Sequence, residues 1–100
     1  MHWLSDQSLI FSPTGRHVVN FQVDFPLRLF CYDLKSHHLT PNYHDYLEIC
    51  YIYDGQCVYH IRDESFAVHK GDVVLVSSNE MHGLELFSGF TVKLVCIFFM

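Results

Sequence analysis

The sequence predicts an all-β protein of one domain, arranged as an antiparallel sandwich or barrel. Beyond Pro26, short segments rich in β-branched and aromatic residues alternate with glycine-containing turns. No stretch has the hydrophobic period of a long helix. The chain has 100 residues, of which 50% are hydrophobic and 16% aromatic, so it can bury one core but not two.

The first part of the chain has the weakest pattern. Residues 1–26 are mixed in character, and we expect one short strand there, at Val18–Val23. Within the single domain, which spans residues 1–100, we interpret residues 1–20 as an N-terminal arm over the barrel. Leu27–Leu34 is the first strong strand, and the polar segment Lys35–Tyr43 is the loop after it.

The middle of the chain predicts a hairpin. Tyr46–Tyr53 is a strand, and Gln56–Arg62 is expected to return beside it. The dipeptide Asp54-Gly55 between them is favoured in tight type I′ turns, because both residues tolerate positive φ. Tyr46–Tyr53 is apolar on both faces, so another sheet, a partner chain or a further domain should cover it.

The second half predicts four more strands between short turns. The last strand is again apolar on both faces, which suggests that the polypeptide continues or that a second subunit packs there. We therefore expect a homodimer. These strands are Phe66–His69, Asp72–Val76, Met81–Phe87 and Phe90–Phe99.

Strand alternation places a few polar side chains inside an otherwise apolar barrel. Glu85 is charged and is expected to point outward. His82 and Leu84 lie on the opposite face of the same strand, so they point inward. Apolar walls with a few orienting polar groups are typical of a small-molecule site. The candidate ligand-binding residues are Asn42, His44, Tyr46, Glu48, Tyr59 and His82.

Two stretches resemble the two motifs of the cupin family. Asn42-Tyr-His-Asp-Tyr-Leu-Glu48, followed after six residues by Gly55, resembles the first motif, H-x-H-x3-E-x6-G. Gly71-Asp72 and His82 resemble the start and the end of the second motif. The resemblance implies a cupin double-stranded β-helix, a jelly-roll barrel, with His44, Glu48 and His82 at the floor of a pocket.

One departure from the motif bears on metal binding. Asn42 stands where the metal-binding cupins carry their first His, and Asn is a poor ligand for transition metals. We therefore expect no metal and no other cofactor. The alternative is a divalent metal held by His44, Glu48 and His82, a set of two imidazoles and one carboxylate that resembles many non-haem iron sites.

Residues 42–100 also resemble the N-terminal effector-binding domain of AraC-type transcription regulators. The resemblance implies a dimerising domain that binds a small effector, such as a sugar. It also implies that DNA is bound by a C-terminal helix-turn-helix domain outside this chain. The residues that carry the resemblance are His44, Leu47-Glu48-Ile49, Gly55, Tyr59, Ile61, Lys70-Gly71-Asp72, Val74-Leu75 and His82.

Three functions fit these patterns. The first is a non-enzymatic sensor domain of a transcription regulator, and the second is a small stand-alone metal-dependent cupin enzyme, similar to a dioxygenase or an isomerase. The third is a dimerisation module without a ligand. The net charge of −5 and only six Lys and Arg residues argue against direct binding of nucleic acid by this chain.

Composition also indicates the compartment. The four cysteines form no C-x-x-C pair and lie in apolar runs, as buried cysteines in a reducing compartment do. The start of the chain lacks a signal peptide, and Leu94–Met100, the longest apolar stretch, is too short to span a membrane. We therefore expect a cytoplasmic protein without membrane contact.

Overall fold

The computed structural model describes residues 3–4, 27–35, 43–87 and 89–99, and these residues form strands and no helix. The all-β prediction is confirmed. The expected strand at Val18–Val23, most of the expected arm and Asn42 lie outside the described residues. The strands are β1 (Trp3–Leu4), β2 (Leu27–Leu34), β3 (Leu47–Ile61), β4 (Glu64–His69), β5 (Val73–Val76), β6 (His82–Glu85) and β7 (Val92–Phe99).

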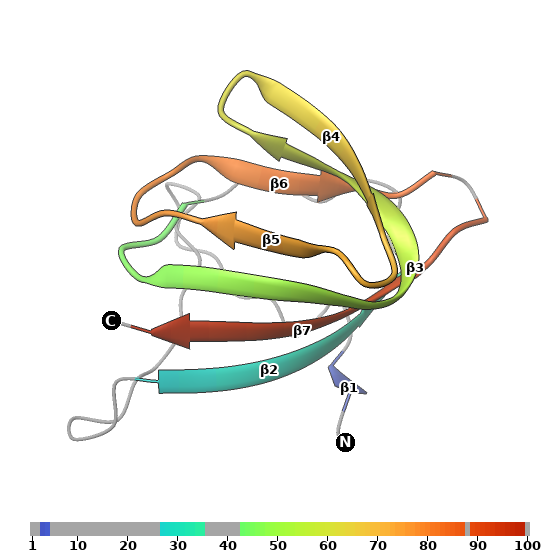
Figure 1. The fold of residues 1–100 in the computed structure, drawn as a ribbon, viewed down its shortest axis with the longest axis horizontal. Helices are drawn as coiled ribbons and strands as arrows, with labels where there is room; N and C mark the ends of the chain where they lie inside the picture. The colour runs from blue at the N-terminus through green and yellow to red at the C-terminus, as the bar shows by residue number, and fades with distance from the viewer. Residues whose placement is uncertain (1–2, 5–26, 36–42, 88, 100) are drawn as a thin grey trace.

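Strand β3 belongs to both sheets of the barrel. Its first half pairs with β5 on one side and β7 on the other, and β2 and β1 extend that sheet beyond β7. Its second half pairs with β4 and β6. Figure 1 shows β3 curving from the lower layer, beside β5 and β7, into the upper layer beside β4.

The predicted hairpin turn at Asp54-Gly55 is wrong, because β3 runs through these residues without reversing. Gly55 has φ 84°, and the register with β7 shifts between Ile52 and Asp54. A Cβ on Gly55 would lie 2.1 Å from the backbone oxygen of Thr91. Glycine is therefore needed here for close approach of β7 and for the bend between the sheets, and not for a tight turn.

The alternation of side chains is as expected on the strands that carry the site. On β6 and just after it, His82, Leu84 and Leu86 are buried, while Glu85 is partly exposed. On β7, every second residue from Val92 to Phe98 is buried. Buried residues from both sheets therefore form one continuous core inside the barrel. No helix in the described residues is long and apolar enough to cross a membrane.

Candidate functional site

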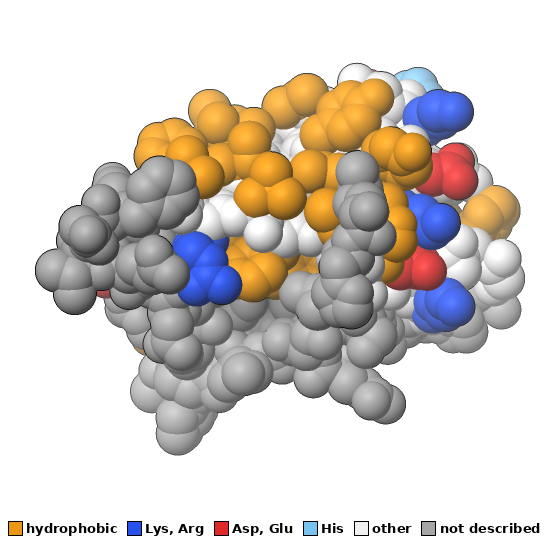
Figure 2. Space-filling model, turned by 90° about the horizontal axis from the view of Figure 1, so that it is seen from below, with side chains coloured by type: hydrophobic (Ala, Val, Ile, Leu, Met, Phe, Trp, Pro, Cys, Tyr) orange, Lys and Arg blue, Asp and Glu red, His pale blue; other side chains and the backbone are white. Residues whose placement is uncertain are grey.

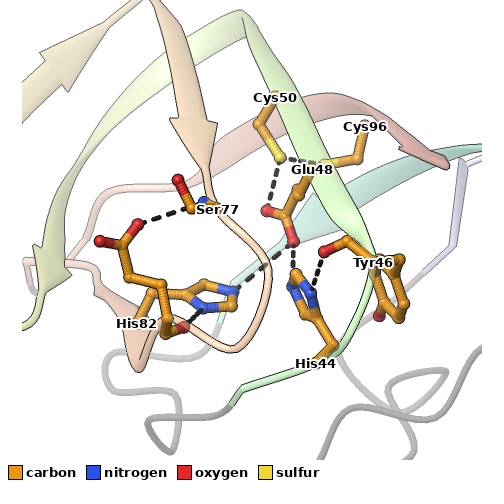
Figure 3. Close-up of polar contacts among 8 residues, drawn as sticks. His44, Tyr46, Glu48, Cys50, Ser77, His82 and Cys96 are labelled. Carbon is orange, nitrogen blue, oxygen red and sulfur yellow. Dashed lines mark hydrogen bonds and ion pairs between the residues drawn. The ribbon is translucent and has the colours of Figure 1, made fainter. Parts of the chain in front are cut away.

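Three predicted site residues meet inside the barrel. His44 lies just before β3, Glu48 is the second residue of β3, and His82 begins β6. The Nε2 atom of His44 lies 2.9 Å from Glu48 Oε1, and the Nε2 atom of His82 lies 3.5 Å from the same oxygen. Their exposed fractions are 0%, 5% and 6%, so the contacts form away from water. Figure 3 shows both imidazoles pointing at the Glu48 carboxylate.

Backbone contacts of the loop between β5 and β6 hold His82 and His44 in place. The backbone N–H of Ser77 donates to Glu80 Oε1 over 3.2 Å, which closes the loop on itself. The backbone N–H of Asn79 donates to the carbonyl of His44, and Asn79 has φ 59°, a conformation that Asn tolerates. The loop therefore ties the two histidine-bearing segments together.

The hydrogen bonds fix the tautomers of both histidines. His44 Nδ1 lies 2.9 Å from the carbonyl oxygen of Tyr46, and His82 Nδ1 lies 2.9 Å from that of Glu80. A carbonyl oxygen can only accept, so both Nδ1 atoms carry the proton. Both Nε2 atoms are then left to face the carboxylate, either as N–H donors of an imidazolium or with free lone pairs.

The same arrangement of His44, Glu48 and His82 that shares protons could also hold a divalent cation. The ligand atoms of His44, Glu48 and His82 all lie within 4.8 Å of one another. Metal-binding histidines commonly donate their other ring N–H to a backbone carbonyl, as both do here. The donor set is the expected set of two imidazoles and one carboxylate, and it could hold a divalent metal.

Without a cation, hydrogen bonds with the imidazoles stabilise the carboxylate. Burial raises the pKa of Glu48, but hydrogen bonds from His44 and His82 outweigh burial and hold that pKa well below its usual range. Burial lowers the pKa of His82, and the hydrogen bond and the charge of Glu48 outweigh it, so the net pKa is raised. The pair therefore favours an ionised Glu48 beside a protonated His82.

Aromatic side chains surround this polar group. The ring of Tyr46 stacks on His44, with centroids 3.9 Å apart and planes 4° apart. Tyr59 is buried as predicted, and so is Tyr32 of β2, which the sequence analysis did not single out. Neither hydroxyl has a hydrogen-bond partner among the described residues. Burial and the charge of Glu48 both raise the pKa of Tyr32 and of Tyr59, which indicates that both face the same interior.

Two cysteines extend the polar group, and the sequence analysis set both aside as buried hydrophobic residues. The thiol of Cys50 donates to Glu48 Oε2 over 2.9 Å, and its sulfur lies 2.6 Å from that of Cys96. Burial raises the pKa of both thiols. Cys50 follows Glu48 by two residues and so shares its face, a signal that was present in the sequence. The position of Cys96 depends on the register of β7, which the sequence does not reveal.

Comparison with known families gives one match, and it covers most of the chain. The sequence model described as AraC-like ligand binding domain matches residues 26–95. A search of curated proteins finds no match.

Solved structures with the same fold include enzymes and a protein of the cupin class. A polyketide cyclase, RemF of Streptomyces resistomycificus, is 17% identical, with TM-score 0.68 over 73% of this chain and 54% of that one. A predicted oxalate decarboxylase of Thermotoga maritima is 22% identical, with TM-score 0.66 over 72% of this chain and 64% of that one. A cupin 2 conserved barrel domain protein of Rhodopseudomonas palustris is 14% identical, with TM-score 0.69 over 84% of this chain and 59% of that one. The cupin prediction for the fold is confirmed, and the chain spans between about half and two thirds of the length of these three structures.

Proposed function

Since the chain belongs to the family of AraC-like ligand-binding domains, we propose that it senses a small-molecule effector inside its barrel. Sugars are the first effectors to test. The domain would act without catalysis and without a metal, as the sensory part of a longer cytoplasmic transcription regulator. Its net charge of −5 supports assigning DNA contact to a separate helix-turn-helix domain outside residues 1–100.

The observation that carries this proposal is a pair of unused hydroxyl groups in the interior that also holds Glu48. The hydroxyls of Tyr32 and Tyr59 are buried and have no partner among the described residues. A buried polar group without a partner destabilises a fold by about 1–3 kcal/mol, so such groups need a function or a guest. Two hydroxyls, an ionised carboxylate and a protonated imidazole form a set that suits a small polyhydroxylated or acidic molecule.

The proposed mechanism is a shift of population between two states of the domain. An effector that binds only one state favours that state by the difference in its affinities. Here the loop between β5 and β6 leads directly into His82 and is tied to His44 through Asn79, so occupancy of the interior acts on that loop. The loop could then change how the domain meets its partner.

A thermal-shift screen of sugars and small organic acids tests the proposal. We expect at least one compound to stabilise the protein, by about 2.7 kcal/mol at a concentration 100 times its Kd. The Tyr59→Phe variant removes one unused hydroxyl and should weaken the response to that compound. If no compound of a broad library stabilises the folded protein, the third alternative, a dimerisation module without a ligand, takes the place of the proposal.

Metal analysis separates the sensor from the metal-dependent enzyme. An enzyme that needs a metal at His44, Glu48 and His82 should retain a near-stoichiometric divalent ion through purification, and His82→Ala should lose it. The sensor proposal expects a protein that folds and responds to its effector after treatment with a chelator. Loss of the effector response on chelation, with recovery on adding metal, would support the enzyme class instead.

We propose that the outer face of the larger sheet is where a second copy packs. The strand register places apolar residues side by side across four strands, so the face is continuous. Leu29 and Leu75 on this face are more than half exposed. Figure 2 shows hydrophobic side chains gathered in the upper part of the view from below. The two rows are Leu29, Ile97, Ile49 and Leu75, and Cys31, Val95, Tyr51 and Val73, of which Cys31 alone is buried.

Two general rules support a second copy as the partner of this face. Apolar sheet faces can stack about 10 Å apart, as in a β-sandwich. Large contiguous apolar patches on soluble proteins mark interaction surfaces. Sedimentation velocity should therefore find a dimer that Leu75→Asp converts to a monomer. Met81→Asp, which replaces an exposed apolar residue outside the two rows, is the matched control and should stay dimeric.

A further inference from the structure

We propose that Glu48, Cys50 and Cys96 form a binding site for a thiophilic metal ion, such as zinc(II), inside the barrel. One ligand atom from each of the three residues lies within 4.8 Å of the others, and all three residues are buried. The site differs from the histidine site because it uses two sulfurs and the other oxygen of Glu48. It shares Glu48 with the proposed effector site, but neither cysteine belongs to the groups proposed to bind the effector.

Strand pairing brings the two sulfurs together. Cys50 of β3 and Cys96 of β7 lie directly opposite each other in the antiparallel register. Both side chains point into the barrel, as the burial of every second residue on these strands shows. Directly opposed side chains on one face lie close enough for their sulfurs to contact the same ion. The site is therefore built on two rigid strands and not on a loop.

The two oxygens of Glu48 have different partners. Oε1 accepts from His44 and lies 3.5 Å from His82, while Oε2 accepts from the thiol of Cys50. A carboxylate that binds a metal through one oxygen is commonly held by hydrogen bonds to the other. In this site the histidines would orient Glu48 from outside the ligand set. Figure 3 shows this chain of contacts from the imidazoles through the carboxylate to both sulfurs.

A metal ion satisfies these groups better than a disulfide does. Cys50 and Cys96 are free thiols in this structure. A disulfide would remove the S–H group that Cys50 donates to Glu48 Oε2. The ionised oxygen would then face sulfur lone pairs in a dry interior, which is unfavourable. A cation replaces the thiol protons and attracts all three groups.

Thiolate ligands select the ion. Sulfur favours zinc(II) and copper(I) over magnesium or calcium, which prefer oxygen. Two zinc–sulfur bonds of about 2.3 Å at a tetrahedral angle place the sulfurs about 3.8 Å apart. The two cysteine side chains must therefore rotate apart when the ion enters. Three protein ligands leave one position of a tetrahedral ion for water or a small ligand.

Cobalt(II) is the probe that tests this site, because its absorption spectrum identifies its ligands. We expect one cobalt ion to bind the reduced, metal-stripped chain and to give a thiolate-to-cobalt charge-transfer band in the near ultraviolet. Zinc(II) should displace the cobalt and remove the band, because zinc binds such sites more tightly. Cobalt held only by His44, Glu48 and His82 would show d–d bands without the charge-transfer band.

Cysteine and histidine variants locate the ion. Cys96→Ser should lose the charge-transfer band, while Cys57→Ser, at another buried cysteine outside the set, should keep it. His82→Asn should keep the band and weaken cobalt binding by about 10–100-fold, as expected for a group that orients a ligand. Circular dichroism tests whether each variant is folded. If Cys96→Ser does not fold, the cobalt spectrum of the wild type still tests the proposal.

Two results would overturn the proposal. One is a reduced, folded wild type that binds no cobalt, and the other is bound cobalt without a charge-transfer band. The effector screen in the presence of chelator is unaffected by either result, so failure here is distinguishable from failure of the sensor proposal.

Discussion

The interior of the barrel and the outer face of its larger sheet each depart from what folding alone would favour. Inside, His44, Glu48 and His82 form a polar group that is almost fully buried. Outside, apolar residues such as Leu29 and Leu75 are more than half exposed. A fold selected only for stability would place apolar residues inside and polar ones outside.

The two departures have different energetic consequences. The hydrogen bonds and charges between a buried carboxylate and two imidazoles offset the desolvation of the group. Replacing the whole group with apolar residues is often neutral or stabilising, but removing one partner alone is strongly destabilising. Exposed apolar residues lower the free energy of unfolding only slightly, but they promote association between protein molecules. The interior should therefore be sensitive to single substitutions, and the outer face should affect association more than folding.

The largest effect should follow removal of the buried carboxylate. Glu48→Ala leaves both imidazoles without their shared acceptor, and breaking a buried ion pair commonly lowers the free energy of unfolding by about 3–5 kcal/mol. Urea denaturation measures this change. Glu85→Ala is the control, because the pair His60–Glu85 is 3.2 Å long with side chains 40% and 42% exposed. It should change stability by less than about 1 kcal/mol, and equal losses in the two variants would contradict the special role of the interior.

The next effect concerns the bend of β3 that joins the two regions. Gly55→Ala would force a Cβ to within 2.1 Å of the Thr91 backbone oxygen at φ 84°, and should lower the free energy of unfolding by about 3 kcal/mol. Gly71→Ala tests φ alone, because its added Cβ meets nothing within 4 Å at φ 97°. Gly71→Ala should lower the free energy of unfolding by about 1 kcal/mol. Similar losses at both glycines would show that φ, and not the contact with β7, requires Gly55.

An identical substitution on the two faces of β5 compares the regions directly. Val76 is 0% exposed and Val73 is 62% exposed. Val76→Ala should lower the free energy of unfolding by about 2 kcal/mol through lost burial and a cavity, and Val73→Ala should change it by less than about 0.5 kcal/mol. A loss at Val73 that grows with protein concentration would indicate that a second copy covers the outer face in solution.

The smallest effect is the dependence of stability on pH. The raised pKa of His82 stabilises the fold fully below the unfolded value of about 6.5, and this contribution is lost as pH rises through the raised value. The lowered pKa of Glu48 acts oppositely, since its contribution is present above about pH 4.3 and is lost as pH falls.

Denaturation across neutral pH measures the histidine part. Stability should fall as pH rises above about 6.5 and through the raised pKa of His82, by at most about 1.4 kcal/mol per pH unit for one proton. His82→Asn should lack this slope, while His69→Asn, at a largely exposed histidine, should keep it. A slope that is unchanged in His82→Asn would assign it to another group.

The sequence predicts the site better than it predicts the path of the chain. The spacing of His44 and Glu48 and the alternation around His82 are local patterns, and each leads to the correct face of its strand. The course of β3 is not local. Asp54-Gly55 suits both a type I′ turn and a bend with positive φ, and the close contact with Thr91 on a distant segment decides between them.

The cysteines show the same limit. The face of Cys50 follows from its neighbour Glu48, but the contact with Cys96 needs the register of β3 against β7. Register depends on the whole sheet, and a slip of one residue would turn Cys96 outward. The apolar outer face was predicted in part, because strand Tyr46–Tyr53 was expected to be covered on both sides.

Calorimetric titration of a stabilising effector tests most directly whether the buried polar group binds the guest. The account predicts that Glu48→Gln, which keeps the shape but not the charge, weakens binding at least about tenfold, or about 1.4 kcal/mol. Glu85→Gln should bind as tightly as the wild type. Equal affinity in a folded Glu48→Gln protein would contradict the account, because the effector would then bind elsewhere.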